Sequence, residues 1–246
     1  LCAITTKDGL FWLGTFDGNL YNINLTDNTF PYNNIRASVN SFCEENDSVL
    51  YIATTEKGLL KLNRKTGIYE KFANKYSNQN SLLNHDINIL RKDAYGNLWF
   101  GTNSGFYKLD AGKNLLTRYA HDSSATNTRA INHIPPDSVY CVHADKKNVW
   151  VGFGDEGLGK LDLGTGKVTH YLYDAKDRNS ISGNSVYCID EDSLVNVWVG
   201  TYNGLDKLNE RNNSIKHYLT GYNINNICID NSGIIWAGTN DGLYQY

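Results

Sequence analysis

One short phrase returns six times along this chain, and it limits the possible folds more than any other feature. Each copy has an aromatic residue, a small residue two positions later and then a glycine-containing turn, as in Trp12-Leu-Gly-Thr-Phe-Asp-Gly18. All five tryptophans occupy the aromatic position, and a tyrosine fills the sixth. The aromatic residues are Trp12, Tyr51, Trp99, Trp150, Trp198 and Trp236, with spacings of 39, 48, 51, 48 and 38 residues. Such a period indicates a chain of repeated supersecondary units.

Each repeat predicts four short strands. In the third repeat they are expected over 87–90, 98–102, 106–109 and 115–119. Asp93 and Gly96 predict a tight turn between the first two strands, because Asp can hydrogen-bond back to the backbone and Gly tolerates a positive φ. Four antiparallel strands at this period predict an all-β fold, a β-propeller of four-stranded antiparallel blades.

The small residue two positions after each aromatic residue is predicted to let neighbouring sheets approach closely. The fixed place of the aromatic residues in every repeat predicts core packing between sheets, in preference to a ladder for stacking ligands. The sixth repeat reaches Tyr246 after its third predicted strand. We therefore expect residues 1–246 to form a single propeller domain, six visible repeats of a seven-bladed ring within a longer chain.

Composition excludes several classes of function. The 23 Lys and Arg residues against 26 Asp and Glu give a net charge of −3, whereas a nucleic-acid-binding domain usually shows a basic surplus. No run approaches the roughly 20 apolar residues of a membrane-spanning helix. We expect neither a nucleic-acid partner nor insertion of this segment into a membrane.

The repeat, Asp-x-x-Gly-x-Leu-Trp-x-Gly-Thr-x-x-Gly-Leu, resembles the two-component regulator propeller repeat, most closely over 81–109, 180–208 and 223–244. The resemblance implies the periplasmic sensor region of a Bacteroides-type hybrid two-component histidine kinase. In that family the propellers bind a glycan fragment or hold a dimer. It therefore implies an oligosaccharide ligand, signalling to a histidine kinase, a possible homodimer through the parent sensor region, and no enzymatic activity in this module.

The cysteines and histidines predict no metal site and no cofactor. Each of the five cysteines falls on the first strand of a different repeat, no Cys-x-x-Cys occurs, and the count is odd. We interpret them as small buried hydrophobes, with no prediction of their redox state. His170 and His217 are predicted as side chains of outer strands. No nucleophile-elbow, zinc-protease or phosphate-loop motif is present.

Unequal repeat length is the most informative functional signal. The extra residues fall between the fourth strand of one repeat and the first strand of the next, at 73–85, 121–137 and 174–185. In a propeller these connections lie on the same face as the turns after the second strands, which we call the loop face. Loops on a rigid scaffold commonly carry binding. The predicted ligand-binding residues are Phe16, Asp17, Tyr76, Asn103, Arg129, His133, Asp155, Arg178, Tyr202, Asn203 and Asp241.

Two alternatives stay open. Related propellers perform lyase or hydrolase chemistry, which would need a tight acid–base group on the loop face, with His85, His133, Asp137 and Glu156 as candidates. A protein-interaction scaffold would instead expose an apolar patch. A deep polar pocket favours the sensor, which is our preferred interpretation because mixed aromatic, amide, carboxylate and guanidinium groups suit a polyhydroxylated ligand.

Overall fold

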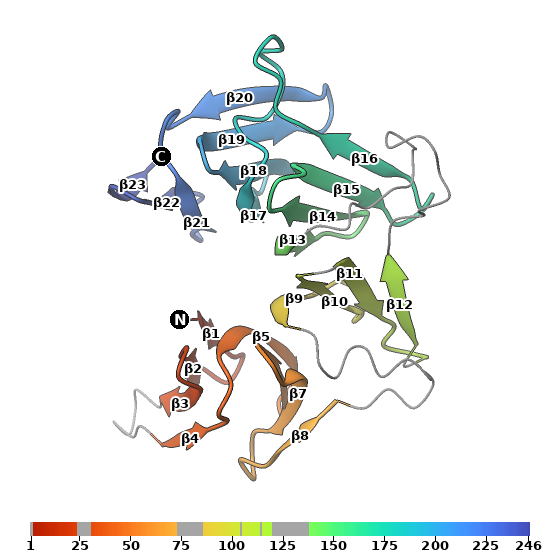
Figure 1. Cartoon of the computed structure of the whole chain (residues 1–246), viewed down its shortest axis with the longest axis vertical. Helices are drawn as coiled ribbons and strands as arrows, with labels where there is room; N and C mark the ends of the chain where they lie inside the picture. The colour runs from red at the N-terminus through yellow and green to blue at the C-terminus, as the bar shows by residue number, and fades with distance from the viewer. Residues whose placement is uncertain (1, 24–30, 73–85, 104, 114, 120–137) are drawn as a thin grey trace. The chain divides into compact units, whose positions relative to one another are not determined.

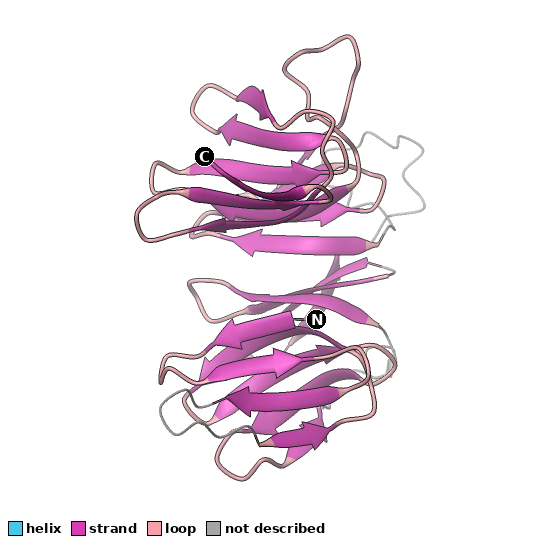
Figure 2. Ribbon diagram, turned by 90° about the vertical axis from the view of Figure 1, so that its left-hand side faces the viewer, coloured by secondary structure: helices cyan, strands magenta, loops and turns pink. Residues whose placement is uncertain are grey.

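The computed structural model describes residues 2–23, 31–72, 86–103, 105–113, 115–119 and 138–246. Figure 2 shows strands and connecting loops throughout these residues. No helix is found in these ranges, so none that is long and apolar enough to cross a membrane. The all-β prediction is confirmed.

Contacts divide the chain into two compact units, Leu1–Arg118 and Tyr119–Tyr246. Three sheets belong to the first unit, and the last residue of β12 begins the second (Figure 1). Blade one contains β1 (Cys2–Thr5), β2 (Phe11–Gly14), β3 (Asn19–Ile23) and β4 (Tyr32–Asn34). Blade two contains β5 (Val39–Asn46), β6 (Val49–Thr54), β7 (Gly58–Asn63) and β8 (Tyr69–Lys71). Blade three contains β9 (Ile87–Lys92), β10 (Leu98–Thr102), β11 (Gly105–Leu109) and β12 (Leu116–Tyr119).

The second unit repeats the same construction. Blade four contains β13 (Val139–Ala144), β14 (Asn148–Phe153), β15 (Leu158–Asp162) and β16 (Val168–Tyr171). Blade five contains β17 (Val186–Glu191), β18 (Asn196–Thr201), β19 (Gly204–Asn209) and β20 (Ser214–Tyr218). Blade six contains β21 (Ile224–Ile229), β22 (Ile235–Thr239) and β23 (Gly242–Gln245).

Strands pair in chain order within every sheet, and all the pairings are antiparallel. Five sheets have four strands, and the described part of blade six has three. This is the blade that the repeats predict, and the six-repeat propeller prediction is confirmed. A seventh blade and a single-domain ring stay predictions.

The turn between the first two strands is built as predicted. In blade three, Asp93 Oδ1 accepts the backbone N–H groups of Tyr95 and Asn97, both at 2.9 Å. Gly96 takes a φ of 84°. The other carboxylate oxygen accepts the indole N–H of Trp99 at 2.8 Å, so one Asp both closes the turn and fixes the repeated tryptophan. Asp192 and Asp230 hold Trp198 and Trp236 in the same way, each at 3.0 Å.

The core lies between neighbouring sheets of each unit, as the repeated tryptophans predict. Trp12, Trp99, Trp150 and Trp198 are buried, whereas Tyr51 and Trp236 are only half-buried. The small residue beside them is needed for close approach. A Cβ added at Gly152 would lie 2.7 Å from Val186 of the next blade, and one added at Gly200 would lie 2.8 Å from Ile224 of the next blade.

Three cysteines contribute to the contact between neighbouring blades. The thiols of Cys2, Cys141 and Cys188 donate to the carbonyl oxygens of Val39, Val186 and Ile224 in the following blades, at 3.4, 3.6 and 3.7 Å. All five cysteines are free. Burial is confirmed for Cys43, Cys141 and Cys188, but the prediction is wrong for Cys228, which is exposed. Cys228 pairs with the aromatic residue Trp236, whereas Cys141 and Cys188 pair with the small residues Gly152 and Gly200.

Candidate functional site

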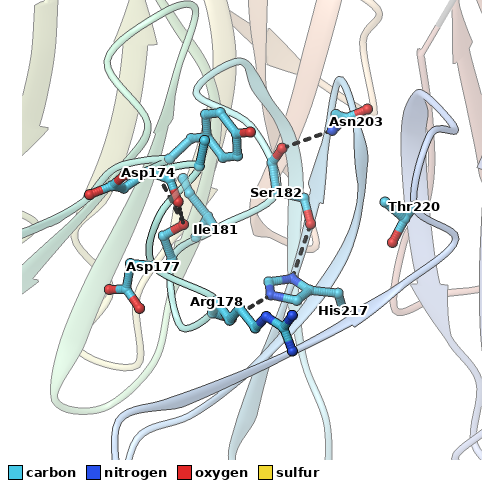
Figure 3. Close-up of a pocket in the computed structure, with 11 residues that line it drawn as sticks. Asp174, Asp177, Arg178, Ile181, Ser182, Asn203, His217 and Thr220 are labelled. Carbon is cyan, nitrogen blue, oxygen red and sulfur yellow. Dashed lines mark hydrogen bonds between the residues drawn. The ribbon is translucent and has the colours of Figure 1, made fainter.

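The insertion between blades four and five forms one wall of a pocket of about 280 Å³ (Figure 3). The opposite wall comes from blade five and the turn that follows β20. Apolar atoms make up most of its surface, and the polar groups on it belong to residues that include Tyr173, Asp177, Arg178, Asn203, His217 and Thr220. The pocket therefore lies on one of the three long connections in which we predict binding.

Short-range hydrogen bonds shape the connection between β16 and β17, residues 172–185, which contains the predicted insertion 174–185. The backbone N–H of Asp177 donates to Asp174 O, and that of Ser180 donates to Asp177 O, both at 3.0 Å, which makes two successive turns. Each Asp also accepts a backbone N–H two residues later, from Lys176 at 2.9 Å and from Asn179 at 2.8 Å. Asp is favoured at such positions because its carboxylate substitutes for a backbone acceptor.

Two contacts anchor the insertion to the blades. Ile181 is 1% exposed and packs into the core shared by blades four and five. The side-chain amide of Asn179 then pairs with the outer edge of blade five, accepting Ile215 N–H at 2.7 Å and donating to Asn213 O at 2.9 Å. The pocket wall is thus held by a buried apolar side chain and by an amide that imitates a strand partner.

A buried carboxylate supplies the third anchor. Asp206 on β19 is 0% exposed and accepts the Ser182 backbone N–H at 2.7 Å and the Ser182 hydroxyl at 2.5 Å. His217 Nδ1 lies 2.7 Å from the same carboxylate, and its Nε2 lies 2.8 Å from the carbonyl oxygen of Arg178. Figure 3 shows His217 between Ser182 and Arg178, so the imidazole joins β20 to the insertion.

The charges follow from this geometry. Burial raises the pKa of the Asp206 carboxyl, and the hydrogen bonds from Ser182 and His217 oppose that rise. Partial burial works against the imidazolium, but the bonds to Asp206 and to the Arg178 carbonyl outweigh it and raise the pKa of His217. Both ring nitrogens face acceptors, and only the imidazolium can donate to both. The arrangement is a hydrogen-bonded ion pair beneath the pocket.

Ser182, His217 and Asp206 have the composition of a hydrolytic triad without its geometry. In a triad the Asp and the Ser bond to opposite ring nitrogens, which leaves one nitrogen to accept the Ser proton. Here Ser182 Oγ lies 3.1 Å from Nδ1, the nitrogen that faces Asp206, while Nε2 faces a backbone carbonyl. No ring nitrogen is placed as a base for the hydroxyl, so this group is a structural anchor.

The structure brings two of the predicted residues into this pocket, Arg178 and Asn203. Three others lie on neighbouring turns of the second unit. Tyr202 is 62% exposed and its backbone N–H donates to Ser185 O at 2.9 Å. Asp155 accepts the Ser185 hydroxyl at 3.4 Å. Asp241 is exposed on the β22–β23 turn.

The predicted residues of the first unit are placed differently. Asp17 accepts the Thr15 hydroxyl and the Asn19 amide, so its carboxylate shapes the β2–β3 turn. Asn103 accepts the Asn88 amide at 2.8 Å, and Phe16 is exposed. Tyr76, Arg129 and His133 lie outside the described residues, as do the enzyme candidates His85 and Asp137.

Sequence reasoning missed Asp206 and did not assign His217 its role. His217 is on the outer strand, as predicted, but it points to a buried carboxylate directly across the sheet. The sequence does contain one signal. Asp206 pairs with the residue that follows the repeated aromatic residue, and the equivalent positions in blades two and three are Leu60 and Tyr107. A carboxylate therefore occupies a position that is apolar in those blades. Among the residues described, no group of three His, Cys, Asp or Glu side chains could hold a metal ion.

Comparisons with known proteins agree with the fold. Residues 81–104 and 218–241 match the family of the two-component regulator propeller. A histidine kinase P4 of Formosa agariphila is 28% identical over 98% of this chain, and the chain spans only 18% of that protein.

Solved structures agree as well. The extracellular domain of the hybrid two-component system BT4673 of B. thetaiotaomicron superposes with a TM-score of 0.76 at 22% identity, over 100% of this chain and 31% of that one. The β-propeller domain of Cps50 (Swd1) from Myceliophteria thermophila gives 0.70 at 12% identity, over 99% and 82% of the two chains. The chain is therefore a β-propeller, and two of its segments match the two-component regulator propeller repeat.

Proposed function

We propose that this propeller is the extracytoplasmic ligand-sensing part of a hybrid two-component regulator, and that it binds an oligosaccharide and signals to a histidine kinase. The repeat family and the histidine kinase relative support the regulatory role. The extracellular domains among the similar structures support a periplasmic location. Pairing of two parent chains through the sensor region is part of the proposal, as the route by which binding would reach the kinase.

The observation that carries the proposal is the pocket on the 172–185 insertion. An oligosaccharide offers many hydroxyl groups, each a donor and an acceptor, on flat rings. The pocket offers the Arg178 guanidinium as a donor, the Asp177 carboxylate as an acceptor and the Asn203 amide as both. Its wall is already anchored by Ile181, Asn179 and Ser182, so binding need not first order the loop.

Ligand-dependent stabilisation tests the proposal. The chain is titrated with a panel of plant and host oligosaccharides. The melting temperature of the chain and the heat of binding are measured. A ligand at about a hundred times its Kd adds about 2.7 kcal/mol to the folded state. We expect Arg178→Ala to weaken binding at least about fivefold, because the pocket loses its guanidinium. Arg211→Ala, an exposed arginine that does not line the pocket, is the matched control.

Three outcomes are informative. Binding that depends on Arg178 and leaves the sugar intact supports the sensor. Binding with consumption of the sugar would replace the sensor with an enzyme. If Arg178→Ala binds as tightly as the unchanged chain, the pocket is not the site.

A further inference from the structure

The innermost strands of blades two to six share one irregularity. In each of them the register with the second strand slips by one residue near the start of the strand, so that one residue has no partner. Such a β-bulge re-aims the side chain that it carries. The bulged residues are Asn40, Asn88, Tyr140, Tyr187 and Asn225.

In the first unit the bulged asparagines bond within the fold. The Asn40 amide donates to Thr55 Oγ1 at 3.0 Å and to the backbone oxygen of Ile87 in the next blade at 2.9 Å. The Asn88 amide donates to Asn103 Oδ1 at 2.8 Å. Both re-aimed amides therefore hold the turn after the second strand, a structural role.

The bulged tyrosines of blades four and five have no side-chain amide and contact each other. Tyr140 and Tyr187 stack on each other, with ring centroids 5.8 Å apart and planes 26° apart. Tyr140 is 42% exposed although Val139 and Cys141 on either side of it are buried. Neither ring belongs to the hydrophobic core that blades four and five share. Tyr187 is half-buried and Tyr140 is exposed, so the stacked pair leaves part of its apolar ring surface in water.

The pair lies at the loop-face end of its strands. Ser185 lies two residues before Tyr187. Its backbone oxygen accepts Tyr202 N–H at 2.9 Å, and its side-chain hydroxyl donates to Asp155 at 3.4 Å. The backbone N–H of Gly154 donates to Ser138 O, two residues before Tyr140, at 3.0 Å. The turn that carries the exposed Asp155 and Glu156 thus adjoins the starts of both strands.

We propose that Tyr140 and Tyr187 form an aromatic subsite that stacks an uncharged pyranose ring. A pyranose ring has a flat face of C–H groups bounded by hydroxyls, which matches a tyrosine ring with its apolar face and polar rim. Asp155 and Glu156 are exposed on the turn that adjoins the starts of both strands, and their negative charges oppose a sulfate or a uronic acid at this position. The proposal rests on the proposed function, because it takes a sugar as the ligand. It adds where one pyranose ring of that ligand binds and that this ring is uncharged.

Substitutions that keep bulk and remove flatness test the stack. We expect Tyr140→Leu and Tyr187→Leu each to raise the Kd for cellotetraose, xylotetraose or mannotetraose, whichever binds most tightly, by about tenfold. Tyr140→Phe and Tyr187→Phe should change it less than about threefold, because the ring remains. Tyr95→Leu, a 67% exposed tyrosine on the β9–β10 turn, should change nothing.

A second measurement reads the two rings directly and does not depend on the folding of the leucine variants. The chain is labelled with 3-fluorotyrosine, and the ¹⁹F resonances of Tyr140 and Tyr187 are assigned with the Phe variants. We expect methyl β-glucopyranoside at tens of millimolar to move these two resonances and leave that of Tyr95 in place. Methyl glucuronide should move them less.

The results separate the two proposals. If the leucine variants bind normally while Arg178→Ala does not, the aromatic subsite is wrong and the sensor stands. If glucuronide moves the ring resonances more than the neutral glycoside, the assigned ligand class is wrong. If no tetrasaccharide binds and neither glycoside moves the resonances, both the subsite and the oligosaccharide ligand are overturned.

Discussion

At the scale of single residues, the position two after each aromatic residue controls how closely two blades pack. Its partner on the innermost strand varies with it. Gly152 and Gly200 face Cys141 and Cys188, whereas Ala53 faces the smaller Ser41. An ideal Cβ at Gly200 would lie 2.3 Å from Cys188 Sγ. The two positions therefore share one volume, and a larger residue on one side needs a smaller one on the other.

Gly200→Ala tests this. We expect it to lower the free energy of unfolding by about 1–3 kcal/mol, because the added methyl overlaps Cys188 and Ile224. Cys188→Ser in the same chain should recover part of the loss by reproducing the Ser41–Ala53 pair. Gly112→Ala is the control, since its Cβ would meet only Asp110 Oδ1 at 3.7 Å. Urea unfolding measures all three, and an unchanged Gly200→Ala would contradict the shared volume.

At the scale of elements, the sequence predicts the strands better than it predicts the pocket loop between β16 and β17. Alternation, the Asp–Gly turns and the repeated tryptophan are local signals, and the structure places the strands where they indicate. The pocket depends on contacts between distant segments, such as Asn179 with the edge of β20 and Ser182 with Asp206. No local pattern specifies those partners, so the insertion could be predicted as a binding loop but its anchors could not.

The His217–Asp206 pair makes the attachment of this loop dependent on pH. The pKa of His217 is raised above its ordinary value of 6.5, so its stabilising contribution is complete below pH 6.5 and is lost as pH rises through the folded-state pKa. We expect His217→Gln to lower the free energy of unfolding by about 1 kcal/mol at pH 6 and by less at pH 9. The value at pH 6 is low for a charge-assisted hydrogen bond because the imidazole ring is partly exposed.

Urea unfolding at the two pH values measures the effect. His170→Gln is the control, because His170 holds the same place on the outer strand of blade four and lies opposite Gly159 in the strand register. A cost for His217→Gln that stays constant or grows with pH would contradict the ion pair.

At the scale of the whole molecule, the thiols report how the two compact units open. Three of the five are buried, Cys2 is partly buried and Cys228 is exposed. The thiolate is the reactive form, and burial raises the pKa of Cys2 and Cys43 to about 11. We expect one thiol to react rapidly with a disulfide reagent at pH 8 in the folded chain, and five in urea.

Cys228→Ser should remove the rapid reaction and leave four thiols that react on unfolding. Rapid labelling of two or more thiols in the folded chain would show that a unit opens without denaturant. The order in which Cys43 and Cys188 become reactive with rising urea would then show which unit opens first, since they belong to different units.

The anchoring of the insertion also bears on how such a chain can evolve. Asn179, Ile181 and Ser182 hold the segment to the blades, and Ile181 and Ser182 also line the pocket. Asp174 and Asp177 line the pocket as well, and their carboxylates bond within their own turns. Substitutions of Asp174 or Asp177 can alter what is recognised while the three anchors stay in place, whereas substitutions of the anchors also weaken the attachment of the segment. Residues 172–185 can thus change in specificity during evolution while the blades that hold them stay the same.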